Sequence, residues 1–301
     1  MKIKYKIHTI DLNFQGHSNT IAAFLIESGN DLILMETGPH STLPVLKAAI
    51  TELGFKMSQI KHVFLTHIHF DHAGAAWCFA PNATIYVHPA GEKHLIDPTK
   101  LYNSAKMIYK DQMSQLWGDM KGIASEKIKV VAQGEKIVVG TMVFTARHTP
   151  GHAVHHIAWQ LGKNLFAGDV AGVKIGDGIV TPPCPPPDID VEAWCESIDL
   201  MRSLKLNTLY MAHFGEEKMV KKHLFSLKRR LLKWAEWIKP YYDQGLTPKQ
   251  VTPQFQEFVK KELARFSIAG DEYERYETAN PAWMSVAGLM RYWRKKLKVE
   301  G

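Results

Sequence analysis

The stretch His67–His72 constrains the fold and the chemistry of this chain more than any other part of it. Within six positions, directly after an apolar run, it places His67, His69, Asp71 and His72. Imidazole nitrogens and carboxylate oxygens are donors that divalent zinc, iron or manganese accept. Burying four such donors without a cation would be costly, because neither a charged carboxylate nor a bare imidazole tolerates an apolar surrounding. The pattern predicts a metal site, with His67, His69 and Asp71 on one face at the end of a strand.

A surface loop that happens to be rich in histidine is the competing interpretation of this stretch. Three further candidate ligands, His152, Asp169 and His213, favour the metal site, because each follows an apolar, strand-like run. In α/β sheets the C-terminal ends of strands present the side chains that bind ligands. Each of the three is weak by itself, since a lone histidine at a strand end is more often hydrogen-bonded structure. Together the seven residues supply enough donors for two metal ions.

The overall composition is that of a globular protein. The 301 residues are enough for one large domain or two small ones, and 46% hydrophobic and 22% charged residues are ordinary proportions. No run approaches the ~18 apolar residues that a membrane span requires, and residues 1–17 lack the apolar region of a signal peptide. The three cysteines form no CxxC pair, which argues for a reducing setting. We therefore expect a cytoplasmic protein.

The chain has two parts of different character. Strand-like runs recur from residues 1–12 to Thr208–Ala212, with helical stretches between them. Beyond residue 216 the apolar spacing is helical, which predicts three helices: one that ends at Pro240, one over Thr247–Ala264 and one over Ala282–Lys298. The sequence therefore predicts an α/β catalytic domain over residues 1–215 and a helical extension over residues 216–301 packed on it.

The net charge of +7 arises in the C-terminal part. Residues 216–301 contain 18 Lys or Arg and 11 Asp or Glu, whereas residues 1–215 contain 19 of each. A basic segment can mark a nucleic-acid partner, but it is more often the solvated face of ordinary helices. We expect a small-molecule substrate and no membrane partner; a nucleic-acid partner is disfavoured, and a homodimer stays open as the oligomeric state.

The motifs HxHxDH, PGH and GD, followed by a last strand-end histidine, resemble the signature of the metallo-β-lactamase superfamily. The resemblance is to its hydrolase branches, which include glyoxalase II and the lactonases, and it covers residues 36–213. It implies an α/β fold, a four-layer αββα sandwich with the metals at one edge of the two facing sheets. It also implies two divalent metal ions, with zinc as the first candidate and iron or manganese as alternatives. By this resemblance one ion binds His67, His69 and His152, the second binds Asp71, His72 and His213, and Asp169 bridges the pair.

The resemblance implies a reaction as well as a site. Two ions in such a site share a bridging hydroxide, lower its pKa and polarise the scissile carbonyl or phosphoryl oxygen. The catalytic carboxylates are then Asp71, which accepts the proton of the nucleophile, and Asp169. We expect a dinuclear metal-dependent hydrolase of an ester, thioester or lactone. The alternative is a phosphodiesterase acting on nucleotide or nucleic-acid substrates, and a scaffold with purely structural metals is disfavoured because the full donor set is present.

Three places depart from the family pattern or lack an assigned role. The family commonly has Asp-x-Gly where this chain has Glu36-Thr37-Gly38, and the longer carboxylate can still orient a ligand imidazole. Many N-acyl-homoserine lactonases have a tyrosine where this chain has Gly172, which weakens the lactonase interpretation. Of the unusual pair His155-His156, one residue could support a ligand, but a structural role in the following strand is the main expectation.

Two segments are expected to wall the site, Leu101–Trp117 and Thr181–Asp188. Aromatic, methionine and proline residues outnumber cations in them. This favours an acyl substrate over a phosphodiester, which needs cations to hold the phosphate charge. Ribonuclease Z relatives carry a His-Glu-His element near the last ligand, and His213–Glu216 lacks it.

Overall fold

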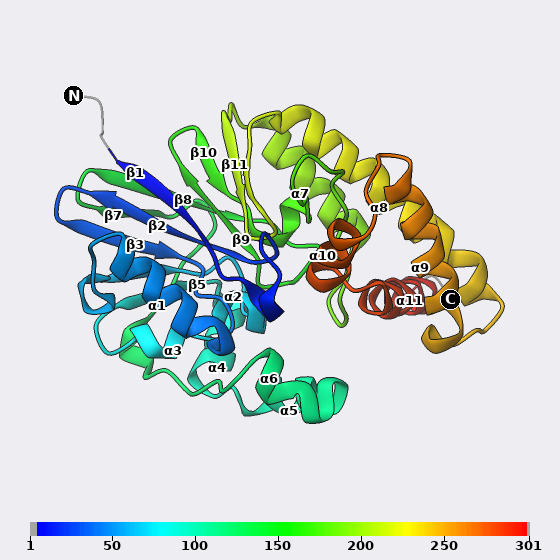
Figure 1. Cartoon of the computed structure of the whole chain (residues 1–301), viewed down its shortest axis with the longest axis horizontal. Helices are drawn as coiled ribbons and strands as arrows, with labels where there is room; N and C mark the ends of the chain where they lie inside the picture. Colours follow the sequence, from blue (N-terminus) through cyan, green and yellow to red (C-terminus); the bar gives the residue numbers. More distant parts are fainter. Residues whose placement is uncertain (1–4, 300–301) are drawn as a thin grey trace. The chain divides into compact units, whose positions relative to one another are not determined.

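The computed structural model describes residues 5–299 (Figure 1). The chain forms two compact units. Residues up to 148, together with 155–167, form the first unit, and residues 149–154, together with those from 168 onward, form the second. The second unit thus combines the C-terminal helices with residues that the sequence places in the catalytic domain. The predicted domains, 1–215 and 216–301, stay a prediction that a truncation can test.

The first unit contains a six-stranded mixed sheet whose strands follow chain order. β1, β2 and β3 are antiparallel, whereas β3, β4, β5 and β6 run parallel to one another. The strands β3 to β5 are short and almost continuously apolar, as expected where both faces of a sheet are covered. The strands are β1 (Lys6–Asp11), β2 (Ala22–Ser28), β3 (Asp31–Met35), β4 (His62–Phe64), β5 (Thr84–Val87) and β6 (Ile128–Val130).

The first unit also contains four antiparallel strands of a second sheet, in the order β10-β9-β8-β7. Aromatic rings join the two sheets: the ring of Phe64 on β4 lies 4.7 Å from that of Phe144 on β8 and 4.9 Å from that of Trp159 on β9. All three side chains are fully buried, so a core lies between the sheets. The strands are β7 (Lys136–Val139), β8 (Met142–His148), β9 (Ile157–Leu161) and β10 (Asn164–Phe166).

Helices cover the other face of the mixed sheet. Leu46 and Ile50 on α1 and Leu95 on α4 belong to one apolar cluster with Leu34 and Val63 of the sheet. In Figure 1, α1 and α3 lie along the blue strands. The first unit is therefore a layer of helices, a mixed sheet and an antiparallel sheet, which confirms the predicted α/β class. The helices are α1 (Leu43–Glu52), α2 (Phe70–Ala73), α3 (Ala76–Phe79), α4 (Pro89–Ile96), α5 (Thr99–Tyr109) and α6 (Met113–Leu116).

The second unit contains one β-hairpin and the helices α7 to α11. Helix α8 packs against α7, and α11 packs against α8 and α9. The inner faces of these helices are aromatic: Trp234 on α8 packs edge-on against Phe255 on α9, and the indole of Trp293 donates to the carbonyl of Ala235. The elements are β11 (Thr208–Met211), β12 (Gly215–Glu217), α7 (Val191–Ser203), α8 (Val220–Asp243), α9 (Pro248–Ala264), α10 (Asp271–Ala279) and α11 (Ala282–Val299).

The predicted elements need a few corrections. Helix α8 does not end at Pro240 but continues to Asp243, because proline removes only its own N–H and its carbonyl still accepts a bond from the amide of Gln244. The sequence does not predict α10 or β12. The N-terminal strand is confirmed from Lys6 onward, and its first four predicted residues lie outside the described part. Over residues 5–299, no helix combines the length and the apolarity needed to cross a membrane.

Candidate metal centre

The first two predicted ligands lie in a loop, because β4 ends before the metal-binding stretch. The backbone leaves the parallel ladder at Thr66, whose carbonyl accepts a bond from the amide of Ile157 at 2.7 Å. The expectation that alternation along a strand aligns His67, His69 and Asp71 is therefore wrong. A loop held by a neighbouring segment presents the first two of them instead.

Asp71 and His72 follow on α2, a single helical turn. The amides of His72 and Ala73 both donate to the carbonyl of His69, at 3.1 and 2.9 Å, and this closes the turn. The ring of His72 consequently lies 3.9 Å from that of His67, measured between centroids. Both rings are fully buried, whereas the Asp71 side chain remains 20% exposed. One short stretch of chain thus brings four donors together.

The two loop histidines approach each other as neighbouring metal ligands do. Nε2 of His67 and Nδ1 of His69 lie 2.9 Å apart, and Nδ1 of His67 lies 3.1 Å from the hydroxyl of Thr66. Two imidazole nitrogens at this distance need a shared proton or a cation, since two facing lone pairs repel each other. The pair therefore fits a metal, with Thr66 orienting the ring of His67.

Glu36, at the position where the family commonly has aspartate, faces His72. Its Oε1 lies 3.4 Å from Nδ1 of His72, and its Oε2 accepts a bond from the Thr66 amide at 3.4 Å. The carboxylate is only 2% exposed, so its charge depends on such partners. The adjacent Thr37 holds the same turn, because its amide and its hydroxyl both donate to the carbonyl of His72. The longer carboxylate thus orients a predicted ligand.

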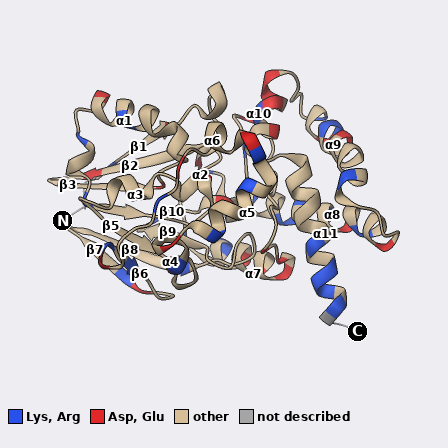
Figure 2. Cartoon of the chain, turned by 90° about the horizontal axis from the view of Figure 1, so that it is seen from below, with Lys and Arg blue, Asp and Glu red and all other residues tan. Residues whose placement is uncertain are grey.

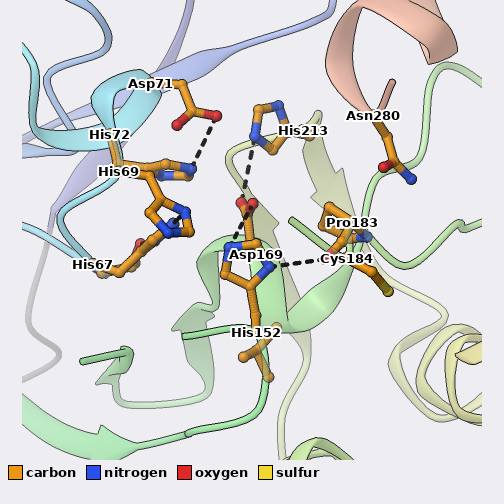
Figure 3. A network of polar contacts seen from close by, with 12 residues as sticks. His67, His69, Asp71, His72, His152, Asp169, Pro183, Cys184, His213 and Asn280 are labelled. Atoms are coloured by element: carbon orange, nitrogen blue, oxygen red, sulfur yellow. Dashed lines mark hydrogen bonds and ion pairs between the residues drawn. The ribbon is translucent and has the colours of Figure 1, made fainter. Parts of the chain in front are cut away.

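In the second unit, the carboxylate of Asp169 lies between two histidines. Its Oδ2 is 3.4 Å from Nε2 of His152, and its Oδ1 is 3.4 Å from Nε2 of His213 (Figure 3). Nδ1 of His152 bonds at 2.9 Å to the carbonyl of Pro183, in the predicted wall segment Thr181–Asp188, and must carry a proton because a carbonyl only accepts. In the neutral ring, Nε2 then directs a lone pair at a carboxylate oxygen. A cation removes this repulsion, so these donors also fit a divalent metal.

Trp194 on α7 locates two of the ligands of the second unit. Its indole donates to the carbonyl of Val170 at 2.9 Å, directly after Asp169. Its backbone leaves no room for a side chain at Gly151, where an added Cβ would lie 2.3 Å from the Trp194 Cα. Gly151 also has a φ of 130°, which favours glycine. The Pro-Gly turn before His152 is thereby fixed against the helix.

The pair His155-His156 lies against the predicted ligands of the first unit. The ring of His155 is stacked 6.1 Å from His67 and edge-on 5.6 Å from His69, and the ring of His156 is stacked 5.2 Å from His67. Both side chains are buried. Strand β9 begins only at Ile157, so the pair lies directly before that strand and not within it. The pair supports the ligand rings instead.

The predicted wall Leu101–Trp117 brings aromatic side chains to the four donors His67, His69, Asp71 and His72, which we call the first cluster. The ring of Trp117 lies 5.3 Å from Tyr109 and 6.1 Å from Phe70. Burial raises the pKa of the Tyr109 hydroxyl, and the nearby Asp71 carboxylate raises it further. An aromatic surface therefore adjoins a predicted catalytic carboxylate.

Comparison with known proteins identifies the family of the chain. The family Lactamase_B, described as the metallo-beta-lactamase superfamily, matches residues 19–213, which include all seven predicted ligands. The chain belongs to this superfamily. Its members are zinc-dependent hydrolases, so the chain is a metal-dependent hydrolase, as predicted. The number and the identity of the ions stay predictions.

Similar proteins extend over most of the superfamily region. The metallo-beta-lactamase fold-containing protein ST1585 of Sulfurisphaera tokodaii is 30% identical over 183 residues, 58% of this chain and 69% of that protein. The probable polyketide biosynthesis zinc-dependent hydrolase PksB of Bacillus subtilis is 23% identical over 204 residues, 67% and 75% of the two chains. The solved structure of TTHA1429, a superfamily protein from Thermus thermophilus, has a TM-score of 0.66 at 18% identity, covering 97% of this chain and 93% of that one. This likeness confirms the predicted fold class, the metallo-β-lactamase sandwich with C-terminal helices.

Two other superfamily relatives are named for a reaction. Thioesterase pkgB of Emericella nidulans is 27% identical over 194 residues, 63% of this chain and 44% of that protein. N-acyl homoserine lactonase AttM of Agrobacterium fabrum is 31% identical over 105 residues, 34% of this chain and 38% of that protein.

Proposed function

We propose that this superfamily member hydrolyses an ester, a thioester or a lactone. It uses two divalent metal ions, with zinc as the first candidate for their identity. The observation that supports the proposal is the set of seven His and Asp donors, which cluster in each unit and all lie within the region that matches the superfamily. In this proposal His67, His69 and His152 hold one ion, Asp71, His72 and His213 hold the other, and Asp169 bridges them. When bound, the ions supply activated water and stabilise the negative charge that develops on the substrate oxygen.

The two carboxylates fit different roles because their exposure differs. The side chain of Asp169 is 4% exposed and directs both oxygens at imidazoles, which suits a ligand that bridges cations. That of Asp71 is 20% exposed, so it can take a proton from water and release it to solvent. We assign the proton transfer to Asp71 and the bridging position to Asp169.

Acceptors on the far side of the ligand rings keep the metal-facing nitrogens available. The carbonyl of Pro183 accepts from Nδ1 of His152, and the carboxylate of Glu36 faces Nδ1 of His72. With Nδ1 as the protonated nitrogen, Nε2 of each ring presents its lone pair to a cation. These two contacts therefore set both the tautomer and the direction of the ligand.

The aromatic side chains of the first unit favour an acyl substrate. Phe70, between His69 and Asp71 in the sequence, has its ring 6.1 Å from each of the rings of Tyr102 and Trp117. An apolar surrounding strengthens the stabilisation of an oxyanion, but it offers a phosphodiester no cation for its remaining charge. The relatives named thioesterase and N-acyl homoserine lactonase support the same chemical class.

The phosphodiesterase alternative would need cations for the phosphate, and Lys and Arg do gather on the last turns of α11 (Figure 2). Three of them are already engaged within the second unit. Arg291 and Lys295 donate to the carbonyl of Pro187, and Lys296 pairs with Glu192. Within the described residues, these cations serve the packing of α11, and they do not favour the alternative.

A substrate panel tests the reaction class. One zinc-loaded preparation is assayed with aryl esters, acyl thioesters, lactones and bis-aryl phosphodiesters. We expect the best carbonyl substrate to exceed the phosphodiesters in kcat/KM by more than about tenfold, which corresponds to ~1.4 kcal/mol of transition-state free energy. Asp169→Asn serves as the background control, since activity that survives in it comes from free metal or contaminants. A preference of the same size for phosphodiesters contradicts the proposal.

A further inference from the structure

A cluster of ionisable side chains in the second unit has no role among the predicted ligands. It consists of Lys174, Glu217 and His223, which we call the triad. Nζ of Lys174 donates to Oε2 of Glu217 at 2.5 Å, and Nδ1 of His223 lies 3.7 Å from the same oxygen. Glu217 and His223 are buried. The triad joins the hairpin β11–β12 to helix α8.

One end of the triad is bonded to the turn that carries Asp169. Nε2 of His223 lies 2.7 Å from the carbonyl oxygen of Ala171, and the ring is the donor because a carbonyl only accepts. Ala171 is the last residue of the turn Gly168–Ala171, which is closed by a bond from the amide of Gly172 to the carbonyl of Asp169. Helix α8 thus holds the turn Gly168–Ala171 by its backbone, and this turn carries the predicted bridging carboxylate of Asp169.

The other end is bonded to the segment that carries His213. The amide of Lys174 donates to the carbonyl of His213 at 2.6 Å. Glu217, on β12 of the same hairpin, receives the Lys174 ammonium with one oxygen and the amide of Met219 with the other, at 2.5 Å. Lys174 is therefore bonded through its backbone to the segment of His213 and through its side chain to Glu217, while His223 is bonded to the turn of Asp169.

The electrostatics of the triad argue against a purely stabilising role. Burial opposes the charge of Glu217, but the bonds from Lys174 and from the amide of Met219 hold the pKa of this carboxyl below its ordinary value. For His223, burial lowers the pKa because it disfavours the protonated ring. A well-packed apolar cluster of the same volume often stabilises a fold as well as a buried ionic one. What the polar cluster adds is directional bonds, and the one from His223 ends on the carbonyl of Ala171 in the turn that carries Asp169.

We propose that Lys174, Glu217 and His223 are positioning residues that fix the backbone of Asp169 and His213 and so set the metal affinity of these two ligands. The inference rests on the proposed function, because it requires a metal at Asp169 and His213. Groups that orient metal ligands typically contribute about 10–100-fold to affinity.

Zinc affinity, measured by competition with a chromogenic chelator, and the absorption spectrum of the cobalt-loaded protein test the proposal. His223→Phe keeps a ring but removes the donor to Ala171, whereas His223→Gln retains an N–H donor. Lys174→Met removes the ammonium that binds Glu217 and keeps the backbone amide that donates to His213. The Lys174 side chain is partly exposed, so this variant gives the test if His223→Phe folds poorly. We expect affinity to fall about tenfold or more, with a changed cobalt spectrum, in His223→Phe and Lys174→Met, and to stay within about threefold of wild type in His223→Gln.

Trp293→Phe is the matched control, because it also removes one N–H donor to a carbonyl in the second unit, that of Ala235 on α8. We expect it to lower Tm and leave zinc affinity unchanged. Wild-type affinity in the folded His223→Phe and Lys174→Met proteins, or an equal loss in Trp293→Phe, overturns the inference and leaves the proposed function standing. A wild-type protein that binds no zinc overturns both.

Discussion

The two units supply their metal-binding side chains in contrasting ways. In the first, one loop and one helical turn assemble four donors from six consecutive positions. In the second, His152, Asp169 and His213 come from three distant segments, and bonds from Trp194, His223 and Lys174 hold those segments in place. Local geometry therefore depends on a short stretch of sequence in one case and on helix packing in the other. We call His152, Asp169 and His213 the second cluster, and we expect its metal affinity to be the more sensitive to substitutions far from the metal.

Truncation after Gly215 should have the largest effect. It removes α8, and with it the His223 bond to Ala171 and the Arg230 bond to the carbonyl of Val180. It also removes Leu227, which packs beside Gly172, and so exposes apolar surface. We expect insoluble protein, or protein without a cooperative melting transition by circular dichroism. A soluble, cooperatively melting and active fragment would instead establish residues 216–301 as a dispensable extension and weaken the contrast between the units.

Neutralising one carboxylate in each unit should separate metal binding from proton transfer. Asp169→Asn is expected to lose most of its metal and nearly all activity, since a neutral amide bridges two cations poorly. Asp71→Asn is expected to keep more metal while kcat falls by about 10²–10⁴, the usual contribution of a proton acceptor. Metal analysis after gel filtration, together with kcat, distinguishes the two. Equal metal loss in both variants would remove the distinction in role.

The contrast between the units also explains what the sequence can predict. His67, His69, Asp71 and His72 are recognisable by spacing alone, although the placement of the first three on a strand is wrong, because Thr66 bonds to Ile157 rather than continuing the ladder. Ligands of the second unit require the strand-end context and the family resemblance. Neither source reveals His223, which looks like an ordinary helix residue until α8 is packed.

The helices and strands are likewise predictable only where their signal is local in the sequence. Long periodic segments such as α9 and α11 are predicted nearly to their ends, because an apolar stripe of helical spacing is a local property. Helix α10 has an acidic first turn and buries only Tyr276, so its sequence carries little periodic signal. The three residues of β12 pair only because the hairpin with β11 brings them there. The position of the His155-His156 pair is also not predictable from local sequence, since its proximity to His67 arises from tertiary structure.

Glu36→Gln should produce a smaller change, confined to the first cluster. The amide keeps the size of the side chain but loses the charge that faces Nδ1 of His72. We expect zinc affinity to fall by less than about tenfold, below the usual effect of a residue that orients a ligand, because the amide still fits the same space, with little change in Tm. Glu27→Gln, a more exposed carboxylate in the same unit, is the control and should leave zinc affinity unchanged. A loss equal to that in His223→Phe would mean that the first cluster is no more robust than the second.

The smallest expected effect concerns pH and His88, at the start of α4 in the first unit. Burial, with a smaller contribution from His148, lowers the pKa of His88 to about 4, and its Nδ1 accepts a bond from the amide of Ala90 at 3.0 Å. The unfolded chain binds the proton near its ordinary pKa of 6.5, so this contribution to stability is complete above that pH and is lost as the pH falls towards 4. One proton corresponds to a slope of at most about 1.4 kcal/mol per pH unit.

His88→Asn isolates this contribution, because an asparagine oxygen can accept the same Ala90 bond without titrating. Denaturant unfolding of metal-free protein between pH 7 and pH 4 should show a shallower loss of stability in the variant than in the wild type. All other ionisable groups are the same in both proteins, so the difference between the two slopes reports the replacement of His88. Parallel slopes would show that protonation of His88 does not limit the acid stability of the first unit.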